Sequence, residues 1–334
     1  MSNSLLNWVD NFIGKKIMVI GDMIADVYLE GKISRISREA PVLVLEYANE
    51  TVVPGGAANV VYNVAMLGGA VYGLGVVGSD ASGEEITRIL QAQSVNTDGF
   101  YRDATRPTIT KTRVIAGGLA TVRQHVVRID KETREPLSQE AEHYLLNKIE
   151  ALHRTMDAVV LDDYGSNSIT PKIREKTIAC CRAAGVPCIV DSRYNILAYH
   201  GVTLVKQNEA ELATAVGYSL DNETTLIRAG QELLQRLDAD AVLITRGPDG
   251  ITLFEKEGRY SHIPVTNASE VFDVSGAGDT VVATMMLALA AGAPTIDAVR
   301  LANFAAGIVV RKAGTATASP EELKRAIGGA DENS

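Results

Sequence analysis

The sequence lacks the features of several protein classes, beginning with those that cysteine and histidine would indicate. Three cysteines occur among 334 residues, an odd number bunched in one segment: Cys180, Cys181 and Cys188. A disulfide framework needs an even and spread set, so we expect buried thiols in a reducing compartment. The five histidines are scattered without the spacing of metal ligands, so the sequence predicts neither a zinc site nor histidine catalysis.

Long apolar runs and a surplus of basic residues are also missing. The longest apolar run, Val281–Pro294, is shorter than the roughly 20 residues that a membrane-spanning helix needs. Residues 1–16 lack the pattern of a secretory signal. Lysine and arginine number 32 against 41 aspartates and glutamates, a net charge of -9, whereas nucleic-acid binding needs clustered basic residues. We therefore predict a cytoplasmic protein that binds neither nucleic acid nor membrane.

What the sequence does contain is a regular alternation of two patterns. Short β-branched apolar runs alternate with helical patterns, mostly of ten or more residues, as in a doubly wound, mostly parallel α/β sheet flanked by helices. The predicted strands are 16–21, 71–77, 158–161, 188–190, 204–206 and 241–245, and the predicted helices are 57–67, 84–93, 139–152, 171–184, 209–216, 226–237 and 277–310.

Two segments, 27–52 and 101–130, break this alternation with short β-prone runs. Ligands of open α/β sheets bind at the carboxyl ends of the strands, and a β excursion directly after the first strand would cover that edge as a lid. The predicted organisation is a lid made of these two segments, an α/β core of residues 1–26, 53–100 and 131–330, and a frayed C-terminus, 331–334.

The glycine-rich stretch 272–280 (FDVSGAGDT), directly before an apolar helical pattern, is the most informative motif. Backbone N–H groups of Gly276, Ala277 and Gly278, together with the positive end of the following helix, suit the charge of a transferred phosphoryl group. Asp279 in the first turn would stay ionised and accept a hydroxyl proton. Taken alone, the motif could equally be a tight turn with an ordinary first-turn acid.

Further polar residues fall at the edge where open α/β sheets bind ligands. Glycines in the segment 55–59 (GGAAN) allow close approach of the backbone to a ligand, and carboxylates after strands can bind the hydroxyl groups of a ligand. For each residue a strand-end or helix-start turn without a ligand is the alternative. The candidates are Asp22, Asp26, Gly55, Gly56, Asn59, Asp162 and Asp191.

With the 55–59 and 272–280 motifs in this order, the chain resembles the ribokinase-like (PfkB) carbohydrate kinases over essentially its whole length. The resemblance implies that Asp279 is the catalytic base, that Gly276, Ala277 and Gly278 form an anion hole, and that ATP and Mg²⁺ are used. A monovalent cation is an optional activator in this reading. Ile24 stands where ribokinases often carry Asn, which disfavours ribose as the substrate.

The same resemblance assigns the nucleotide site. Asn208 and Glu211 would order Mg²⁺ through water, which suits the reluctance of this ion to dehydrate; a plain helix N-cap is the alternative for Asn208. The loop 245–250 would touch the phosphates and ribose, or could be a simple hairpin turn, and the small-residue helix 302–307 would lie near adenine, or serve core packing. The residues carried over are Thr245, Gly247, Gly250, Ser275, Asn303 and Gly307.

Several lid and loop segments resemble bacterial heptose 7-phosphate kinases, namely 33–42, 111–113, 128–130, 162–165 and 270–276. This resemblance implies ATP-dependent phosphorylation at C1 of D-glycero-β-D-manno-heptose 7-phosphate, giving the 1,7-bisphosphate for ADP-heptose and lipopolysaccharide core synthesis. A separate nucleotidylyltransferase and a phosphatase would be pathway partners. We also expect a homodimer through the lids, because exposed sheet edges seek partners. Arg113 is a candidate substrate ligand, and the basic residues available for the sugar phosphate, or merely solvated, are Arg35, Arg38, Lys111, Arg113, Arg123 and Arg128.

Three alternatives remain open. The first is a kinase of the same fold for fructose phosphate, ketodeoxygluconate or a nucleoside. The second is a nicotinamide-dependent oxidoreductase, which is disfavoured because Gly21-Asp22 lacks a glycine-rich dinucleotide turn after the first strand. The third is a non-catalytic sugar-binding protein, which Asp279 disfavours.

Overall fold

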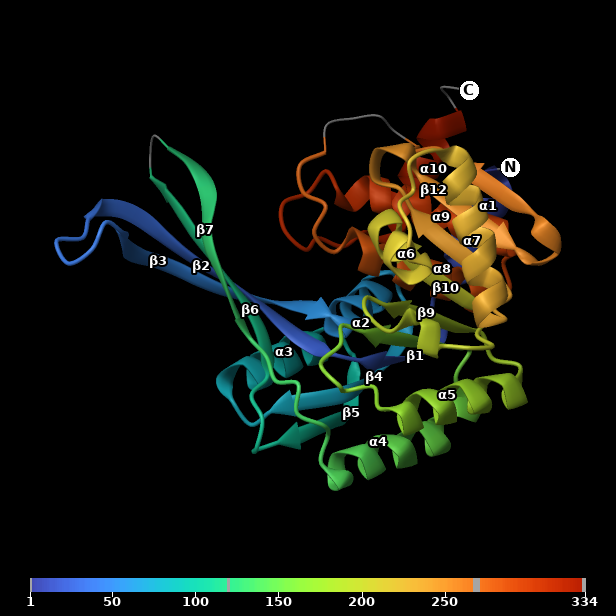
Figure 1. Cartoon of the computed structure of the whole chain (residues 1–334), viewed down its shortest axis with the longest axis horizontal. Helices are drawn as coiled ribbons and strands as arrows, with labels where there is room; N and C mark the ends of the chain where they lie inside the picture. Colours follow the sequence, from blue (N-terminus) through green and yellow to red (C-terminus); the bar gives the residue numbers. More distant parts are fainter. Residues whose placement is uncertain (1, 119–120, 267–270, 332–334) are drawn as a thin grey trace.

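Two sheets organise the chain in the computed structural model, which describes residues 2–118, 121–266 and 271–331. The large sheet has nine strands in the order β13-β12-β11-β10-β9-β8-β1-β4-β5, with helices on both faces, and a four-stranded sheet, β3-β2-β6-β7, projects from it (Figure 1). From β5 to β11 neighbouring strands are parallel, while β12 and β13 add antiparallel pairs. The predicted doubly wound α/β fold with a β lid is confirmed.

The strands of the large sheet follow the predicted apolar runs, with β5, β12 and β13 in addition. Its strands are β1 Lys16–Gly21, β4 Ala70–Gly78, β5 Asn96–Asp103, β8 Ala158–Asp163, β9 Cys188–Ser192, β10 Leu204–Asn208, β11 Ala241–Thr245, β12 Ile251–Glu255 and β13 Tyr260–Ile263. The lid strands are β2 Met23–Ile36, β3 Leu43–Gly56, β6 Ile109–Gly118 and β7 Thr121–Lys131.

The helices divide between the two faces of the large sheet. Side chains of α1, α2, α3, α8, α9 and α10 pack in one apolar cluster, and those of α4, α5, α6 and α7 in the other. The helices are α1 Ser2–Asp10, α2 Ala57–Met66, α3 Ala81–Ala92, α4 Gln139–Leu152, α5 Pro171–Ala184, α6 Glu209–Val216, α7 Glu223–Leu237, α8 Ala277–Ala290, α9 Thr295–Val309 and α10 Pro320–Asp331.

Strand β1 shows why an unbroken apolar run is needed in the centre of this sheet. Successive side chains of a strand point to opposite faces; Ile17 and Val19 enter the cluster with α8, whereas Met18 and Ile20 enter the cluster with α4 and α5. Both faces are covered, so alternation with polar residues would bury unpaired polar groups. The run ends at Gly21, and polar chemistry begins with the next residue.

The order of the strands determines which edge of the large sheet can bind a ligand. From β1 the chain winds outward to β4 and β5 on one side and, through β8, to β9, β10 and β11 on the other. The crevice at such a reversal, outside the carboxyl ends of the strands, is where open α/β sheets bind ligands. In the register, Gly21 of β1 stands opposite Asp162 of β8. Asp22, which follows β1, and Asp162, near the end of β8, therefore lie where the strand order reverses.

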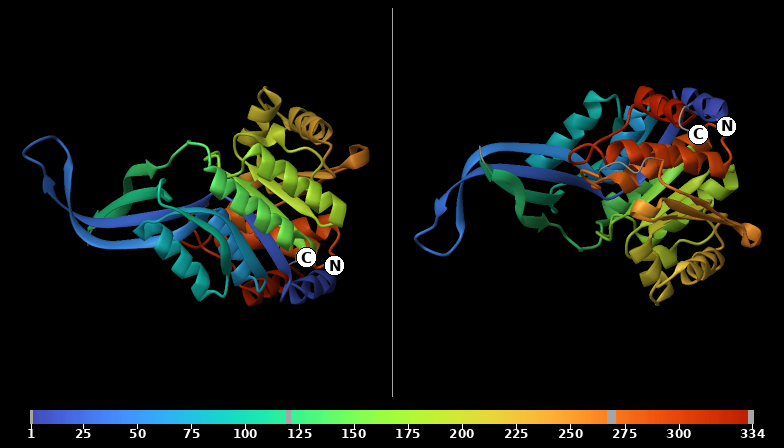
Figure 2. Two further views of the ribbon diagram at one scale, coloured as in Figure 1. Left: turned by 90° about the horizontal axis from the view of Figure 1, so that it is seen from below. Right: turned by 90° about the horizontal axis from the view of Figure 1, so that it is seen from above.

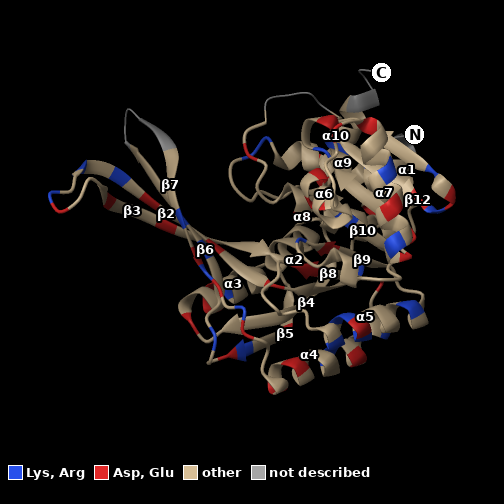
Figure 3. Cartoon of the chain, viewed as in Figure 1, with Lys and Arg blue, Asp and Glu red and all other residues tan. Residues whose placement is uncertain are grey.

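The lid extends this edge away from the core. Strands β2 and β3 pair antiparallel along their length, β6 joins β2 in parallel, and β7 pairs with β6. The inner residues of β2 are buried and the outer ones exposed, and the β2–β3 pair reaches far beyond the core in both views of Figure 2. On this projecting part β2 carries the basic residues Lys32 and Arg35, and the neighbouring β3 carries the acidic residues Glu46 and Glu50. Figure 3 shows charges of both signs on the two strands.

Some boundaries differ from the predicted ones. The predicted helix 277–310 is two helices, α8 and α9, because Gly292 adopts φ +89° and Pro294 precedes α9. The lid strands β2 and β3 extend beyond 27–52 at both ends of that segment, and β5 takes residues 101–103 into the large sheet. Of the predicted frayed end, Asp331 closes α10 and 332–334 lie outside the described residues. Glu270 and the side chain of Arg123 also lie outside them.

Two features concern the membrane and the redox state of the cysteines. None of their helices combines the length and apolar character that crossing a bilayer requires. Cys180, Cys181 and Cys188 are free thiols and are buried, as expected from their position in an α/β core.

Candidate active site

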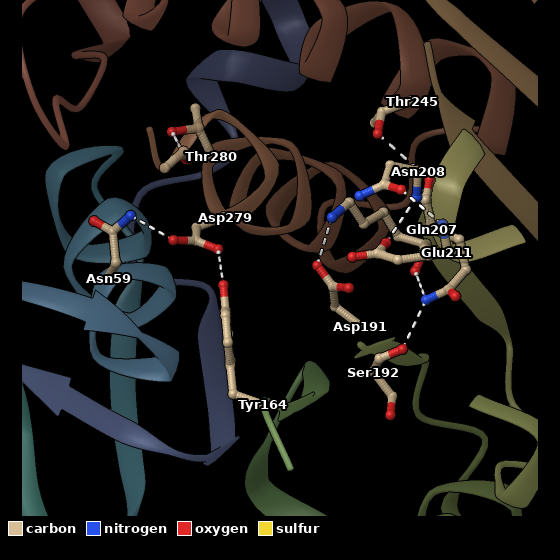
Figure 4. A network of polar contacts seen from close by, with 12 residues as sticks. Asn59, Tyr164, Asp191, Ser192, Gln207, Asn208, Glu211, Thr245, Asp279 and Thr280 are labelled. Carbon is tan, nitrogen blue, oxygen red and sulfur yellow. Dashed lines mark hydrogen bonds and ion pairs between the residues drawn. The ribbon is translucent and has the colours of Figure 1, made fainter. Parts of the chain in front are cut away.

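A glycine turn brings Asp279 into contact with residues from distant parts of the chain. Gly276 caps α8 with φ +77°, and Asp279 lies in the first turn of that helix, 6% exposed. The amide of Asn59, on α2, donates to Oδ2 of Asp279 at 2.6 Å. The hydroxyl of Tyr164, in the loop after β8, donates to Oδ1 at 3.2 Å (Figure 4). Both carboxylate oxygens are therefore oriented by neutral donors.

The electrostatic surroundings of Asp279 suit a base that works near neutral pH. Burial raises the pKa of Asp279 to about 6, against the lowering effects of the hydrogen bond from Asn59 and the charge of Lys206. A carboxyl with such a pKa is about nine-tenths ionised at pH 7. It is nevertheless more basic than an exposed aspartate, so it can take a proton from a hydroxyl more readily.

Lys206 carries a positive charge among the acidic residues Asp191, Glu211 and Asp279. Its Nζ lies 2.7 Å from Oδ2 of Asp191, and both side chains are nearly inaccessible. Burial alone would lower the pKa of Lys206, but the carboxylates of Asp191 and Glu211 outweigh burial, so the pKa lies above its ordinary value. A Cβ at Gly278 would come within 2.9 Å of this Nζ. Lys206 thus stays charged directly beside the glycine turn.

Asp162 is a buried acid without a partner. It is fully buried, and among the described residues neither of its side-chain oxygens has a hydrogen-bond partner. Burial, followed by the charges of Asp191 and Asp279, raises the pKa of Asp162 well above its usual range. Asp162 also lines the cavity next to Asp279, so its two unpartnered oxygens face the space where a ligand would bind.

Asp22 has a different environment from the one predicted for a sugar ligand. Its carboxylate is fully buried and accepts from the backbone N–H of Tyr164 at 2.8 Å, from that of Ser166 at 3.3 Å, and from the Ser166 hydroxyl. These donors come from one loop, so Asp22 fixes that loop and has no exposed oxygen to offer a sugar. These bonds hold the loop after β8 against the end of β1. A contact of Asp22 with a sugar stays a prediction.

Gly55 and Gly56 each lie so close to an aspartate that a side chain would collide with it. A Cβ at Gly55 would lie 2.8 Å from Oδ2 of Asp26, and Gly56, with φ +53°, would place a Cβ 2.8 Å from the backbone oxygen of Asp22. Asp26 in turn pairs with Nη1 of Arg113 at 2.7 Å. The junction between lid and core is therefore packed so closely that no larger residue fits at positions 55 and 56.

A cavity of about 1130 Å³ opens from Asp279 across the carboxyl ends of the strands. It contains polar groups at one end, around Asp162 and Asp191, and small or apolar groups at the other, around α9. Predicted residues that line it are Asp162, Asp191, Asn208, Glu211, Thr245, Gly247, Gly250, Ser275, Gly276, Ala277, Gly278, Asp279, Asn303 and Gly307. Those that do not line it are Asp22, Asp26, Gly55, Gly56, Asn59 and Arg113.

Asn208 and Glu211 form a complete capping box at the start of α6. The Glu211 N–H donates to the Asn208 side chain, and the Asn208 N–H donates to the Glu211 carboxylate, both at 2.8 Å. Asn208 therefore does cap helix α6, as the alternative interpretation of the sequence predicts, and Glu211 is its partner in the cap. Both residues also line the cavity. Burial raises the pKa of Glu211. Among the described residues no group of three or more histidine, cysteine, aspartate or glutamate side chains is placed to hold a metal ion.

The residues at the far end of the cavity are held by structural contacts. The Asn303 side chain donates to the backbone oxygen of Pro264 at 2.7 Å. A Cβ at Gly307 would approach Oγ1 of Thr266 to 3.2 Å, and one at Gly250, where φ is +84°, would collide with the backbone oxygen of Ile263. The turn after β11 does lead into an antiparallel hairpin with β12. These contacts keep side chains out of a space wide enough for a flat ligand.

Comparison with known proteins decides the family. The model of the pfkB family of carbohydrate kinases matches residues 14–322. The chain belongs to the pfkB family of carbohydrate kinases. As a member of this family with the fold described above, it is a sugar kinase.

Relatives and solved structures agree with this assignment. The chain is 42% identical over 311 residues to the bifunctional protein HldE of Pelobacter propionicus, covering 93% of this chain and 62% of that protein. The corresponding protein of Geotalea uraniireducens is 41% identical over 320 residues, covering 96% and 64%. The chain thus spans less than two thirds of the length of these relatives.

Similar structures share the fold at low identity. Phosphofructokinase-2 from Escherichia coli, in complex with substrates and products, aligns with a TM-score of 0.77 and 21% identity, covering 95% of this chain and 99% of that one. Ribokinase from Arabidopsis thaliana, complexed with ribose and ATP, aligns with a TM-score of 0.75 and 20% identity, covering 94% and 99%.

The sequence prediction gave no role to three side chains at the site, although Tyr164 lies in the predicted segment 162–165. Tyr164 bonds to Asp279, Lys206 neutralises Asp191, and Arg193 lines the cavity. A lysine inside an otherwise buried apolar strand was the available signal for Lys206, because charged residues are almost never fully buried unless they are paired. Nothing in the local pattern distinguishes Tyr164 from a core aromatic residue.

The contact between Gly276 and Asn59 provides a test of this geometry. A Cβ at Gly276 would lie 2.7 Å from the Asn59 amide nitrogen, so Gly276→Ala should push Asn59 away from Asp279. We expect kinase turnover to fall about 100-fold, as displacements of catalytic groups of this order do.

Gly292→Ala is the matched control. Gly292 adopts a similar positive φ, +89°, at the other end of α8, but a Cβ there meets nothing within 4 Å. Both variants should lose roughly 1–2 kcal/mol of stability from backbone strain, measured by thermal unfolding. Equal losses of turnover in the two variants would contradict a special contact at Gly276.

Proposed function

We propose that this sugar kinase transfers the terminal phosphoryl group of ATP to the C1 hydroxyl of D-glycero-β-D-manno-heptose 7-phosphate. The observation that carries the proposal is the meeting of Asp279, its Asn59 donor and the helix N-terminus at one end of a large cavity. The choice of sugar rests on the heptose-kinase resemblance of the lid and loop segments and on the identity to HldE. The choice of ATP is supported by the ribokinase of the same fold that is complexed with ribose and ATP.

In this mechanism the Asp279 carboxylate accepts the proton of the sugar hydroxyl. The hydroxyl oxygen forms a bond to the terminal phosphorus of ATP while the bond from that phosphorus to the bridging oxygen breaks, and ADP leaves. Asp279 holds the proton at a carboxylate oxygen after transfer. Its ionisation near neutral pH matches this task, because the base must be charged before the sugar binds.

Stabilisation of the transferred group comes from the start of α8. In this proposal the N–H groups of Gly276 and Gly278 bind the transferred group at the start of the helix, where the helix dipole adds positive potential. The N–H of Ala277 donates to the backbone oxygen of Val274 at 3.2 Å, so Ala277 contributes less than predicted. Lys206 lies beside Gly278 and adds a full charge. Both features act on negative charge that develops during transfer.

The acidic group at this end of the cavity fits a hydrated divalent cation. Asp162 has unpartnered oxygens, and Glu211 uses one oxygen in its capping box. We propose that Glu211 and Asn208 hold Mg²⁺ through water, where the ion would neutralise charge on the ATP phosphates. A monovalent cation as an additional activator is part of the same proposal.

Two cations near the cavity, Lys111 and Arg193, are suited to bind the sugar phosphate. Lys111, on lid strand β6, lies 4.7 Å above the Tyr164 ring, and Arg193 follows β9, with its backbone N–H bonded to Asp163. Within the described ranges neither side chain has a carboxylate at ion-pair distance. Arg113, the predicted ligand, is instead neutralised by Asp26.

The environment of Lys111 is that of a cation without its counter-ion. Burial lowers the pKa of Lys111, and Arg193 lowers it further, against the opposing effect of Asp26. One phenol ring separates this ammonium group from the base, since the Tyr164 hydroxyl bonds to Asp279. A sugar with its acceptor hydroxyl at Asp279 would therefore extend its opposite end toward Lys111 and Arg193. This favours a sugar phosphate over a neutral sugar.

Replacement of the base tests the reaction itself. Asp279→Asn should lower turnover on heptose 7-phosphate by about 10²–10⁴-fold, the usual worth of a general base, while thermal unfolding shows a folded protein. ADP release would be measured across sugar 7-, 6- and 1-phosphates and free sugars. For the wild type, kcat/KM should fall below about pH 6, because protonation of a carboxyl with a pKa of about 6 removes the base.

The control is Asp297→Asn, at the first-turn acid of α9, which bonds to Trp8 and Arg300 away from the cavity. This variant should keep its turnover. Nearly full activity of Asp279→Asn on the best substrate would refute the assignment of the base. A higher kcat/KM for fructose phosphate, ketodeoxygluconate or a nucleoside would refute the heptose.

The phosphate site predicts a selective effect of Lys111→Met. Loss of a charge-assisted contact worth about 1.5–3 kcal/mol should raise KM for the sugar phosphate roughly 10- to 100-fold and leave KM for ATP nearly unchanged. Lys32→Met, on the exposed part of β2, is the control and should change neither. A rise in KM for ATP in place of the sugar phosphate would place Lys111 at the nucleotide.

We also propose a homodimer through the lid. Exposed apolar side chains are concentrated on this thin sheet, and a second lid is a self-complementary cover for them. They are Ile33, Ile36, Val42, Leu43, Tyr47, Val126, Val127 and Ile129.

The double variant Ile36→Asp/Ile129→Asp tests this dimer. It should sediment as a monomer under conditions where the wild type is dimeric, because burying two unpaired charges is costly. The control Ile13→Asp/Tyr260→Asp adds the same two charges at exposed apolar residues outside the lid and should stay dimeric. A wild type that is monomeric at all concentrations would contradict the lid dimer.

The physiological setting is proposed on the same basis. A cytoplasmic kinase that makes the 1,7-bisphosphate requires a phosphatase and a nucleotidylyltransferase to complete ADP-heptose. A non-catalytic sugar-binding role is disfavoured by the ionisable base and its donors, which binding alone would not require.

A further inference from the structure

Tyr164 occupies a position between the lid and the base. Its loop follows β8, its ring is half-buried at the cavity, and its hydroxyl donates to Oδ1 of Asp279 at 3.2 Å. On the ring face, Lys111 of the lid lies 4.7 Å from the centroid. The charge of Asp279, followed by burial, raises the pKa of Tyr164 well above its usual range. The phenol therefore stays protonated and can act only as a donor to the carboxylate.

The loop that carries Tyr164 is held at the switch point of the sheet. The Tyr164 N–H donates to Asp22 at 2.8 Å, and the Gly165 N–H donates to Asp163 at 2.9 Å. Asp163 is itself fixed by the Ser192 hydroxyl at 3.0 Å and the hydroxyl of fully buried Tyr199 at 2.8 Å. Groups fixed in this way need no reorganisation when the substrate binds.

We propose that Tyr164 is a positioning residue for the base, fixing the plane of the Asp279 carboxylate so that Oδ1 receives the proton of the acceptor hydroxyl. Each carboxylate oxygen has two acceptor sites. Asn59 holds Oδ2 with a short bond of 2.6 Å, whereas the bond from Tyr164 to Oδ1 is longer, at 3.2 Å. The more weakly bonded oxygen keeps more of its basicity. This inference rests on the proposed role of Asp279 as the base.

The arrangement has a consequence for pH dependence. The charged and titratable groups around Asp279 are Lys206 from β10, Asp191 from β9, Asp162 from β8 and Tyr164 itself. Lys206 and the Tyr164 hydroxyl favour the carboxylate, and Asp191 and Asp162 disfavour it. Removal of the Tyr164 hydroxyl leaves the acids in place and takes away a donor, so the pKa of Asp279 must rise.

The test is Tyr164→Phe, which removes one oxygen and keeps the ring under Lys111. The acid limb of the kcat/KM profile should move upward by about one pH unit relative to the wild type. At low pH this shift corresponds to a roughly tenfold lower kcat/KM. At pH 8.5 the difference in kcat/KM should shrink to less than about threefold. Tyr144→Phe, whose hydroxyl bonds to the backbone of Asp98 on the surface, should leave the profile unchanged. An equal loss at every pH would indicate a merely structural effect and overturn the proposal.

A second measurement separates this inference from the choice of sugar. The carboxyl carbon of Asp279, labelled with ¹³C and assigned with Asp279→Asn, would be titrated by NMR in wild type and Tyr164→Phe without substrate. A higher midpoint in the variant supports the inference, and an unchanged midpoint overturns it even if heptose 7-phosphate is the substrate. A wild type without turnover on any sugar phosphate would refute the proposed function alone.

Ser166→Ala provides a second variant should Tyr164→Phe fold poorly. It keeps the phenol but removes the hydroxyl that donates to Asp22, which loosens the loop. The NMR midpoint of Asp279 should then move in the same direction by a smaller amount. A downward shift would contradict the proposed link between the loop and the base.

Discussion

One buried carboxylate that must remain charged is the constraint on which the rest of the site depends. Burial disfavours the anion of Asp279, and its neighbours offset only part of that cost, so its pKa settles near 6. Each neighbour comes from a different element: Asn59 from α2, Tyr164 from the loop after β8, and Lys206 from β10. The sheet order brings these elements together at a single edge. The fold thus serves to hold several weak donors around one acid.

The sequence was sufficient to predict the fold and to mark the glycine motifs as places of close backbone approach, for physical reasons. Apolar runs such as 16–21 must be buried on both faces, and the glycines at 55, 56 and 276 exclude side chains from close contacts. It was insufficient for contacts that depend on tertiary register. The role of Asp22, the pairing of Lys206 with Asp191, and the bond from Tyr164 are set by which strands are neighbours, and no local pattern records that.

The lid combines two demands on one thin sheet. Its inner end must pack tightly against the core, which the closely packed glycine pair beside Asp26 and the ion pair with Arg113 achieve. Its outer end exposes apolar side chains among charged ones. Lys111 lies between these two regions, over the Tyr164 ring.

The long sequence separation within the site bears on how the protein is made. Asn59 and Asp279 are 220 residues apart, and α8 covers the face of the sheet to which Val19 and Val160 contribute. During synthesis β1 and β8 leave the ribosome well before α8, so this apolar face is covered only in part, by α1, α2 and α3, until the last part of the chain emerges. Such nascent intermediates are prone to aggregate. A chain that ends before α8 would lack the helix that covers this apolar face, and it would lack Asp279 as well. We therefore expect premature termination to give a product that is inactive and prone to aggregate.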